Sequence, residues 1–289
     1  MKTLLKSIYE KVPFKKELFS ALRAVWTPPE SLYRHLHFKG VITVHIGKEH
    51  SFKAQHYGYK VENDLFWSGI YGGWERNSLD AWTRLSARAS VVFDIGANTG
   101  IYSLLTKAMN RKAEVHAFEP VSRVYQKLVH NSELNQYNIH CVNKALSNNT
   151  GTALLYDNDA DHEYSATLSQ HGPVPLTHTK EVATITLDDY IEQNGIQRID
   201  LMKIDVEGFE PEVLQGFARY IRVFRPAILI EILEDAVGAQ VEALVEGNGY
   251  QFYRMIEESK PQRVTALKKF NGFNYLLCDA ETAAFLQLT

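Results

Sequence analysis

The segment at residues 91–100 constrains the fold of this chain more than any other. It reads Val-Val-Phe-Asp-Ile-Gly-Ala-Asn-Thr-Gly, and apolar residues at helical spacing follow it. The pattern predicts a buried strand that turns tightly into a helix, with glycine where the backbone must bend or approach a ligand. The spacing differs from the Gly-x-Gly-x-x-Gly of dinucleotide-binding folds. Asp94 lies two positions before the first glycine, where a carboxylate suits a ligand that carries an ammonium group.

A second acid occurs at the end of the next predicted strand. Residues 115–120 read Val-His-Ala-Phe-Glu-Pro, which places Glu119 at the carboxyl end of a short apolar run. In a doubly wound fold, the carboxylate that binds a ribose lies about twenty residues beyond the glycine turn. The alternative is an ordinary strand–loop–helix unit whose acids only cap helices. The agreement of turn, acid and spacing favours a nucleoside-binding site.

A third segment, Lys-Ile-Asp-Val-Glu-Gly-Phe-Glu at residues 203–210, completes a resemblance to the FkbM family of S-adenosylmethionine-dependent methyltransferases. The resemblance spans about residues 74 to 233, and the Lys-Ile-Asp-Val-Glu-Gly block is specific to that family. Further matching positions are Leu128, Asn131, Asn135, Asn143, Ala145, Leu146, Thr186, Asp189, Leu214, Gly216, Pro226 and Glu231. The resemblance implies an α/β fold, the Rossmann-like class I methyltransferase fold, with a mostly parallel seven-stranded sheet flanked by helices.

The order of apolar patterns along the chain agrees with such a sheet. We expect strands at 90–95, 113–118, 138–143, 199–205, 226–232, 250–255 and 273–278, and helices at 99–109, 121–134, 187–194, 210–220 and 235–248. Before them we expect helical structure to about residue 36, a β-hairpin at 37–56, and an aromatic, glycine-rich loop at 66–75. The chain is therefore divided into an N-terminal extension, 1–75, and a methyltransferase domain, 76–289.

The resemblance implies a set of cofactor-binding residues for S-adenosylmethionine. Asp94 and the backbone around Gly96, Asn98 and Gly100 would hold the methionine tail, and Glu119 would accept hydrogen bonds from the ribose. Asn143 and Ala145 would lie along the adenine, and Asp205 and Glu75 would border the same site. Glu75 could instead cap a helix, and Asn143 could instead be a turn residue.

The strand-end acids of the third segment are the candidate catalytic residues. Lys203 and Asp205 lie two apart on a strand and so share one face, with Glu207 just beyond. Asp205 and Glu207 are expected at the acceptor site. Lys203 is either a base of lowered pKa or, as we favour, a structural ion-pair partner. His162, in the polar segment at 158–181 that we expect to be an exposed loop, is a further candidate base or a solvated loop histidine.

The same acids could instead bind a divalent metal ion. Asp205, Glu207 and Glu231 could hold a hard cation that acidifies an acceptor hydroxyl. We favour a site without metal, in which these acids cap the following helix and fix the loop.

The expected function is methylation of a hydroxyl on a sugar, polysaccharide or natural-product acceptor. An enzyme of the same fold that methylates nitrogen, protein or nucleotide is one alternative, and a catalytically silent cofactor-binding subunit is another. A net charge of −3 argues against bulk electrostatic binding of nucleic acid. No apolar run approaches membrane-span length or forms a signal-peptide core, so a cytoplasmic location is expected. The mildly basic N-terminal helix is expected to pack on its own domain or on a twin subunit in a homodimer, the alternative being a membrane surface.

Overall fold

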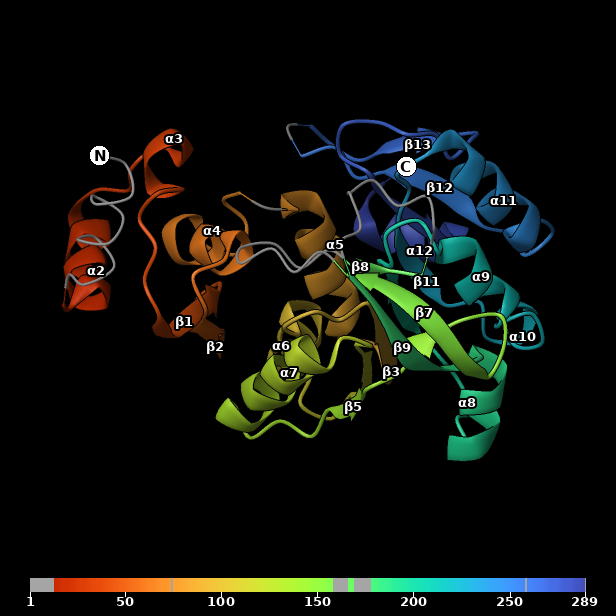
Figure 1. Cartoon of the computed structure of the whole chain (residues 1–289). Coiled ribbons are helices and arrows are strands. Elements are labelled where there is room, and N and C mark those ends of the chain that lie inside the picture. The colour runs from red at the N-terminus through yellow and green to blue at the C-terminus, as the bar shows by residue number, and fades with distance from the viewer. Residues whose placement is uncertain (1–12, 74, 158–165, 169–177, 258, 289) are drawn as a thin grey trace.

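The centre of the molecule is an eight-stranded mixed sheet (Figure 1). The computed structural model describes residues 13–73, 75–157, 166–168, 178–257 and 259–288. The strand order is β13-β12-β14-β11-β10-β3-β4-β5. In the same order the strands span Gln262–Val264, Gln251–Arg254, Asn274–Cys278, Ala227–Glu231, Leu201–Ile204, Val91–Ile95, Glu114–Phe118 and His140–Val142.

Five neighbouring strands of this sheet run parallel, from β5 through β4, β3 and β10 to β11. β14 pairs antiparallel with β11, and β12 and β13 continue that edge by antiparallel pairing. The expected Rossmann-like sheet is confirmed, and all seven expected strands are present. The prediction of seven strands is wrong by one, because β13 is a further edge strand. Two of its three residues are exposed, so the sequence there has no apolar run from which a strand could be predicted.

The two faces of the sheet support two separate apolar cores. Val92 and Ala117 pack with the helices of one face, and Phe93 and Phe118 pack with those of the other. The first face is covered by α5 (Arg76–Ser86), α6 (Ile101–Met109) and α12 (Ala280–Leu286), with Leu128 of α7 (Ser122–Leu134). The second face is covered by α8 (Leu187–Asn194), α9 (Glu210–Gln215), α10 (Ile221–Phe224) and α11 (Asp235–Val245). Within the described ranges, none of these helices, and none elsewhere, has the length and apolar character to cross a membrane.

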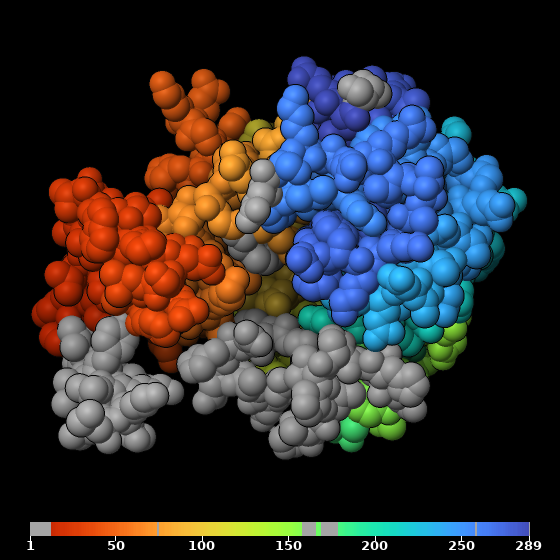
Figure 2. Space-filling view, turned by 90° about the horizontal axis from the view of Figure 1, so that it is seen from above, coloured from red at the N-terminus to blue at the C-terminus, as the bar shows by residue number. Residues whose placement is uncertain are grey.

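The N-terminal segment folds as helices and a hairpin. It comprises α2 (Lys15–Val25), α3 (Glu30–Tyr33), β1 (Gly40–Ile46) and β2 (His50–His56), and the last two form the expected antiparallel hairpin. Seen from above, this segment, red to orange, and the blue C-terminal part lie on opposite sides of the molecule (Figure 2).

The hairpin is tied to α7 by two asparagines. The side-chain oxygens of Asn135 and Asn131 accept hydrogen bonds from the backbone N–H groups of Lys53 and Gln55, at 2.7 and 2.8 Å. The N-terminal segment also shares one apolar core with the first face of the sheet. The boundary at residue 75 therefore divides the chain but not its core, and it stays a prediction.

The expected loop at 66–75 is wrong in its first part. α4 spans Lys60–Ser68, and at its start Glu62 accepts a hydrogen bond from the N–H of Tyr59 at 3.2 Å. Phe66 and Trp67 are buried residues of this helix. The glycines that suggested a loop follow the helix and end it at Gly69, which has a φ of 74°.

A second, smaller sheet lies between β5 and α8 in the sequence. Its order is β6-β9-β7-β8, with strands at Ala145–Leu146, His178–Ile185, Gly151–Asp157 and Ala166–Thr167. The expected exposed loop at 158–181 is thus wrong at its described parts, since β8 and the start of β9 are strand. The remainder of that segment, His162 included, lies outside the described residues.

The expected helix at 210–220 is also shorter than predicted. It ends after Gln215, and α10 follows from Ile221. A Cβ atom on Gly216 would lie 2.2 Å from the carbonyl oxygen of Ser147, so the chain at this point packs directly on the turn after β6. This close approach is a tertiary contact that helical periodicity cannot reveal.

Candidate functional site

The turn after β3 is held by the neighbouring strand β4. The N–H groups of Gly96 and Ala97 both donate to the carbonyl oxygen of Phe118, at 3.1 and 2.9 Å. Gly96 has a φ of 74°, and a Cβ there would lie 1.8 Å from the carbonyl oxygen of Asp205. Glycine at 96 is therefore required where the ends of β3 and β10 meet.

Asp94 presents one satisfied and one unsatisfied oxygen. Its Oδ2 accepts from the backbone N–H and the hydroxyl of Ser103, at 3.0 and 2.7 Å. Its Oδ1 is buried and has no hydrogen-bond partner among the described residues. Burial raises the pKa of Asp94 above its ordinary value, and the nearby charge of Lys203 opposes that shift. Since an unpaired buried acceptor is costly, Oδ1 is prepared for a donor that a ligand brings.

Glu119 lies at the end of β4 and joins two turns. Its Oε1 accepts from the N–H of Val121 at 2.8 Å and its Oε2 from the N–H of Asn98 at 3.0 Å. Burial raises the pKa of this carboxyl to about 7, even though both backbone hydrogen bonds favour the charged form. Each oxygen keeps a lone pair, so Glu119 can still accept from a ligand.

Lys203 is buried in a ring of carboxylates. Its Nζ is 2.5 Å from Oδ2 of Asp205 and lies over the ring of Tyr102, 4.7 Å from the centroid. Burial alone would lower the pKa of Lys203, but the negative charges of Asp205, Glu75 and Asp94 outweigh it and raise the pKa above its ordinary value. Lys203 therefore stays protonated at neutral pH.

Glu75 belongs to the same ring of charges. It accepts a hydrogen bond from the hydroxyl of Tyr102 and precedes α5 with a φ of 47°. Burial raises its pKa, and Lys203 opposes the shift. Glu75 thus acts on the site indirectly, by its hydrogen bond with Tyr102 and by its charge near Lys203.

Acidic groups crowd the ends of β10 and β11. One carboxylate oxygen from each of Asp205, Glu207 and Glu231 lies within 4.8 Å of the other two. Burial, followed by the charges of Asp205 and Glu207, raises the pKa of Glu231 to about 10. Glu210 is fully buried, accepts from the N–H groups of Val206 and Gly208, and has its pKa raised by burial to about 8. At neutral pH, Glu231 and Glu210 therefore hold their protons, which reduces repulsion in the cluster.

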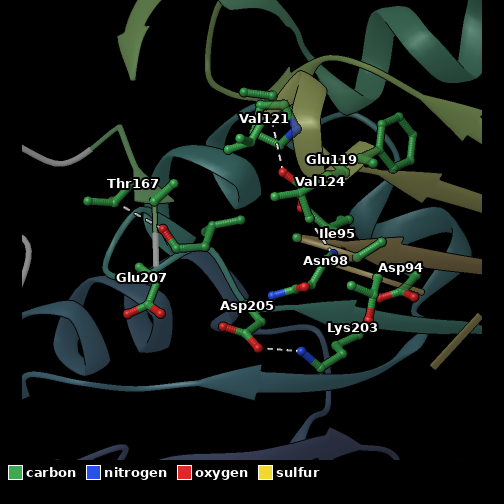
Figure 3. A pocket seen from close by; sticks show the side chains of 18 of the residues that line it. Asp94, Ile95, Asn98, Glu119, Val121, Val124, Thr167, Lys203, Asp205 and Glu207 are labelled. Atoms are coloured by element: carbon green, nitrogen blue, oxygen red, sulfur yellow. Dashed lines mark hydrogen bonds and ion pairs between the residues drawn. The ribbon is translucent and has the colours of Figure 1, made fainter. Parts of the chain in front are cut away.

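A cavity of about 420 Å³ is lined by some of these groups and not by Glu75, Glu210 or Glu231 (Figure 3). The predicted site residues that line it are Asp94, Gly96, Asn98, Glu119, Ala145, Lys203, Asp205 and Glu207. Figure 3 shows the labelled acids, asparagine and lysine converging from the ends of adjacent strands. The cavity thus joins the predicted cofactor side, at β3 and β4, to the predicted acceptor side, at β10.

Three of the predicted cofactor-binding residues are not among those that line the cavity within the described part of the chain: Glu75, Gly100 and Asn143. Gly100 begins α6 with a φ of 90°, and a Cβ there would lie 2.5 Å from Leu128 Cδ1. Asn143 donates from Nδ2 to the carbonyl oxygens of Glu119 and Pro120, at 2.8 and 3.1 Å. Asn143 therefore supports the turn that carries Glu119.

Sequence reasoning missed several residues of the cavity wall. Tyr59, Lys60 and Glu62 come from α4 and its N-cap, between the expected hairpin and the expected loop, where no element was predicted. Arg123 forms an ion pair with Asp157 of β7, in which Nη2 lies 2.6 and 2.7 Å from the two carboxylate oxygens. These residues are far apart in sequence, and no local motif links them. Glu62, at the third position of α4, is a helix-start signal, but the N-cap before it is a tyrosine rather than a common capping residue.

The strand order and the acid-lined cavity at the carboxyl ends of the strands define a class I methyltransferase fold. The chain belongs to the FkbM methyltransferase family, because the family model described as "Methyltransferase FkbM domain" matches residues 94–255, more than half of the chain.

Three relatives illustrate this membership. The chain is 27% identical to Methyltransferase sdnD of Sordaria araneosa, over 61% of this chain and 79% of that protein. It is 29% identical to 31-O-demethyl-FK506 methyltransferase FkbM of Streptomyces tacrolimicus, over 55% and 72%. It is 26% identical to Hexuronic acid methyltransferase AglP of Haloferax volcanii, over 46% and 52%.

Proposed function

We propose that this methyltransferase transfers a methyl group from S-adenosylmethionine to a hydroxyl oxygen of a sugar or natural-product acceptor. The observation that carries the proposal is the single cavity, with a hydrogen-bond-accepting side at Asp94 and Glu119 and a proton-accepting side at Asp205 and Glu207. The names of two relatives support it, since one is named as a 31-O-demethyl-FK506 methyltransferase and the other as a hexuronic acid methyltransferase.

The cofactor side fits a ligand with an ammonium group and a ribose. Asp94 Oδ1 is buried without a partner, and Glu119 keeps one lone pair on each oxygen. An ammonium group and two ribose hydroxyls would supply the missing donors. When bound, S-adenosylmethionine supplies an electrophilic methyl group on a positively charged sulfur.

The acceptor side can take up the proton that a hydroxyl loses. Asp205 is held by Lys203, which fixes its position and partly compensates its charge. Glu207 lies beside it and lines the cavity. We propose Glu207 as the general base and Asp205 as the group that orients the acceptor hydroxyl. Lys203, kept protonated by its carboxylate neighbours, positions Asp205 and does not act as a base.

The charge of this side favours oxygen over nitrogen as the acceptor atom. An amine beside Asp205 and Glu207 would be held as an ammonium ion, because nearby negative charge raises the pKa of an amine. An ammonium nitrogen has no lone pair and cannot attack a methyl group. A hydroxyl is neutral at the same pH and only needs a base to remove its proton.

We propose that the reaction needs no metal ion, although three carboxylates lie close enough to share one. Lys203, whose Nζ is 2.5 Å from Oδ2 of Asp205, already brings a positive charge to this cluster. Activity that survives EDTA unchanged is the expected outcome. Activity lost in EDTA and restored by Mg²⁺ or Mn²⁺ would assign these three residues to a metal site.

The proposed function is tested by supplying S-adenosylmethionine with an isotopic methyl label. Acceptor pools of neutral sugars, uronic acids and hydroxylated aglycones are compared with a matched pool of amines. We expect label in a methyl ether and none in the amine pool. Label in amines, in protein or in nucleotide would replace the oxygen acceptor, and cofactor binding with no labelled product in any pool would favour a silent subunit.

A binding measurement separates the cofactor proposal from the acceptor proposal. By calorimetry, we expect S-adenosylmethionine and S-adenosylhomocysteine to bind and NAD not to bind. NAD binding without S-adenosylhomocysteine binding would reject the cofactor assignment whatever the acceptor is.

A further inference from the structure

We propose that Glu114, His116 and His140 form a binding site for a transition-metal ion, separate from the methyl-transfer cavity. Glu114 and His116 lie at the start of β4, and His140 is the first residue of β5. The cavity lies at the other end of the same strands, where Glu119 follows β4. Nothing in the proposed methyl transfer uses these three residues.

The sheet itself brings the three side chains together. Glu114 and His116 are two apart on one strand and therefore share a face. His116 is the register partner of His140 on the parallel neighbour β5, so their side chains also lie on one face. One carboxylate oxygen and one nitrogen from each imidazole lie within 4.8 Å of one another.

The three groups combine one fixed ligand with two adjustable ones. His116 is 2% exposed, and its Nε2 is 2.9 Å from Oε1 of Glu114. Its ring stacks on that of His140, with the centroids 4.6 Å apart and the planes at 13°. Glu114 and His140 are exposed. They can close on an ion that arrives from solvent, while His116 stays in place.

Tyr190 of α8 fixes which nitrogen of His116 faces the ion. Its hydroxyl lies 2.8 Å from Nδ1, which leaves Nε2 directed at Glu114. Metal-binding histidines commonly engage their second nitrogen with a polar group that holds the ring orientation. In the ion-bound form, Nδ1 carries the proton and donates to the tyrosine oxygen, and Nε2 gives its lone pair to the metal.

The donor set selects a class of ion. Two imidazoles and one carboxylate suit Zn²⁺, Co²⁺ or Ni²⁺, whereas Mg²⁺ and Ca²⁺ prefer oxygen ligands. Ligands about Zn²⁺ stand about 2.0–2.2 Å from the ion, and an imidazole nitrogen binds an ion that lies in its ring plane. Glu114 therefore has to move inward, and the exposed His140 ring has to turn out of its stack on His116, after which solvent can fill the remaining position. The ion would clamp the short edge strand β5 onto β4.

Cobalt is the probe, because its absorption spectrum reports nitrogen ligands. Full-length protein is stripped with a chelator and titrated with Co²⁺ by absorbance and calorimetry. The test variant is His140→Ala, which removes an exposed ligand, and the matched control is His130→Ala, an exposed histidine of α7 outside the cluster. Glu114→Gln is a second test variant that keeps side-chain size and changes the carboxylate alone.

We expect the parent and His130→Ala to bind one Co²⁺ with equal affinity and the same visible spectrum. His140→Ala and Glu114→Gln should bind it at least about tenfold more weakly, since losing even an outer-shell partner of a metal ligand typically costs 10–100-fold. The ion should also raise the melting temperature of the parent and of His130→Ala, and not that of His140→Ala. Equal Co²⁺ affinity in the parent and both test variants, or no saturable binding by the parent, would overturn the proposal.

Discussion

The two sides of the cavity satisfy their carboxylates in opposite ways. On the β3–β4 side, Glu119 accepts hydrogen bonds from the backbone N–H groups of Asn98 and Val121. One oxygen of Asp94 accepts from Ser103, and the other is left for a ligand. On the β10–β11 side, Asp205, Glu207 and Glu231 face one another, with Lys203 bound to Asp205. The first side is organised by the backbone before any ligand arrives, whereas the second retains electrostatic repulsion.

This difference indicates a division of labour. Hydrogen bonds from backbone groups hold a carboxylate in one place. Such a fixed carboxylate suits recognition of the cofactor, which every turnover uses. Carboxylates that crowd together repel one another at a cost to folding, and such costs tend to gather at functional sites. The crowded side is therefore the better candidate for chemistry, and the following predictions test that contrast.

The largest expected effect is on turnover, from the crowded side. Glu207→Gln should lower kcat by about 10²–10⁴-fold, the usual contribution of a general base, and leave S-adenosylhomocysteine affinity nearly unchanged. Kinetics and calorimetry on the same preparation measure both. Glu133→Gln, an exposed residue of α7, is the control. Wild-type turnover in Glu207→Gln would mean that the base lies elsewhere, and Asp205→Asn, with exposed Asp80→Asn as its control, is then the next variant to test.

The next effect is on folding stability. Lys203→Met should destabilise the protein by about 3–5 kcal/mol, because removing one partner of a buried ion pair leaves uncompensated charge. The double variant with Asp205→Asn should recover part of this loss. Chemical denaturation of the single and double variants measures the coupling. If the single and the double variant lose the same free energy of unfolding, the aliphatic stem of Lys203, and not its charge, is what stabilises the fold.

On the backbone-organised side we expect an effect on cofactor affinity. Glu119→Ala should weaken S-adenosylhomocysteine binding by about 1–3 kcal/mol, by loss of hydrogen bonds to the ribose. Unchanged affinity in this variant would remove Glu119 from the site.

The raised pKa of Glu119 gives this binding a pH dependence. With a pKa of about 7 in the empty site, the carboxyl is largely protonated at pH 6 and ionised at pH 8. The ionised form accepts from both ribose hydroxyls, so affinity should rise from pH 6 to pH 8. In Glu119→Gln the rise should disappear, and a rise that persists there would come from another group.

The sequence could predict those parts of the two sides that are formed by short motifs, and not those that are formed by contacts between distant segments. The turn at 94–100, the acid at 119 and the alternation at 203–207 are short patterns on adjacent stretches, and they led to Asp94, Glu119 and Asp205 in the cavity wall. The contribution of Glu62 from α4 and the pairing of Arg123 with Asp157 depend on packing between distant segments. No local period encodes such contacts, so they became visible only in the folded chain.

The smallest predicted effect concerns Asn143 and the turn beside Glu119. Asn143 donates to the carbonyl oxygens of Glu119 and Pro120, and Ser122 donates to its side-chain oxygen at 3.1 Å. Asn143→Ala should loosen that turn and weaken cofactor binding by about 0.5–1.5 kcal/mol, the typical worth of a hydrogen bond.

An analogue distinguishes this indirect role of Asn143 from direct contact with the adenine. S-inosylhomocysteine differs from S-adenosylhomocysteine only in the nucleobase. If Asn143 acts through the turn, the Asn143→Ala variant loses the same factor of affinity for both ligands, because the ribose contact of Glu119 is common to them. If only the affinity for S-adenosylhomocysteine falls, Asn143 contacts the adenine directly. The backbone-organised side of the cavity would then extend further along the cofactor than its lining residues indicate.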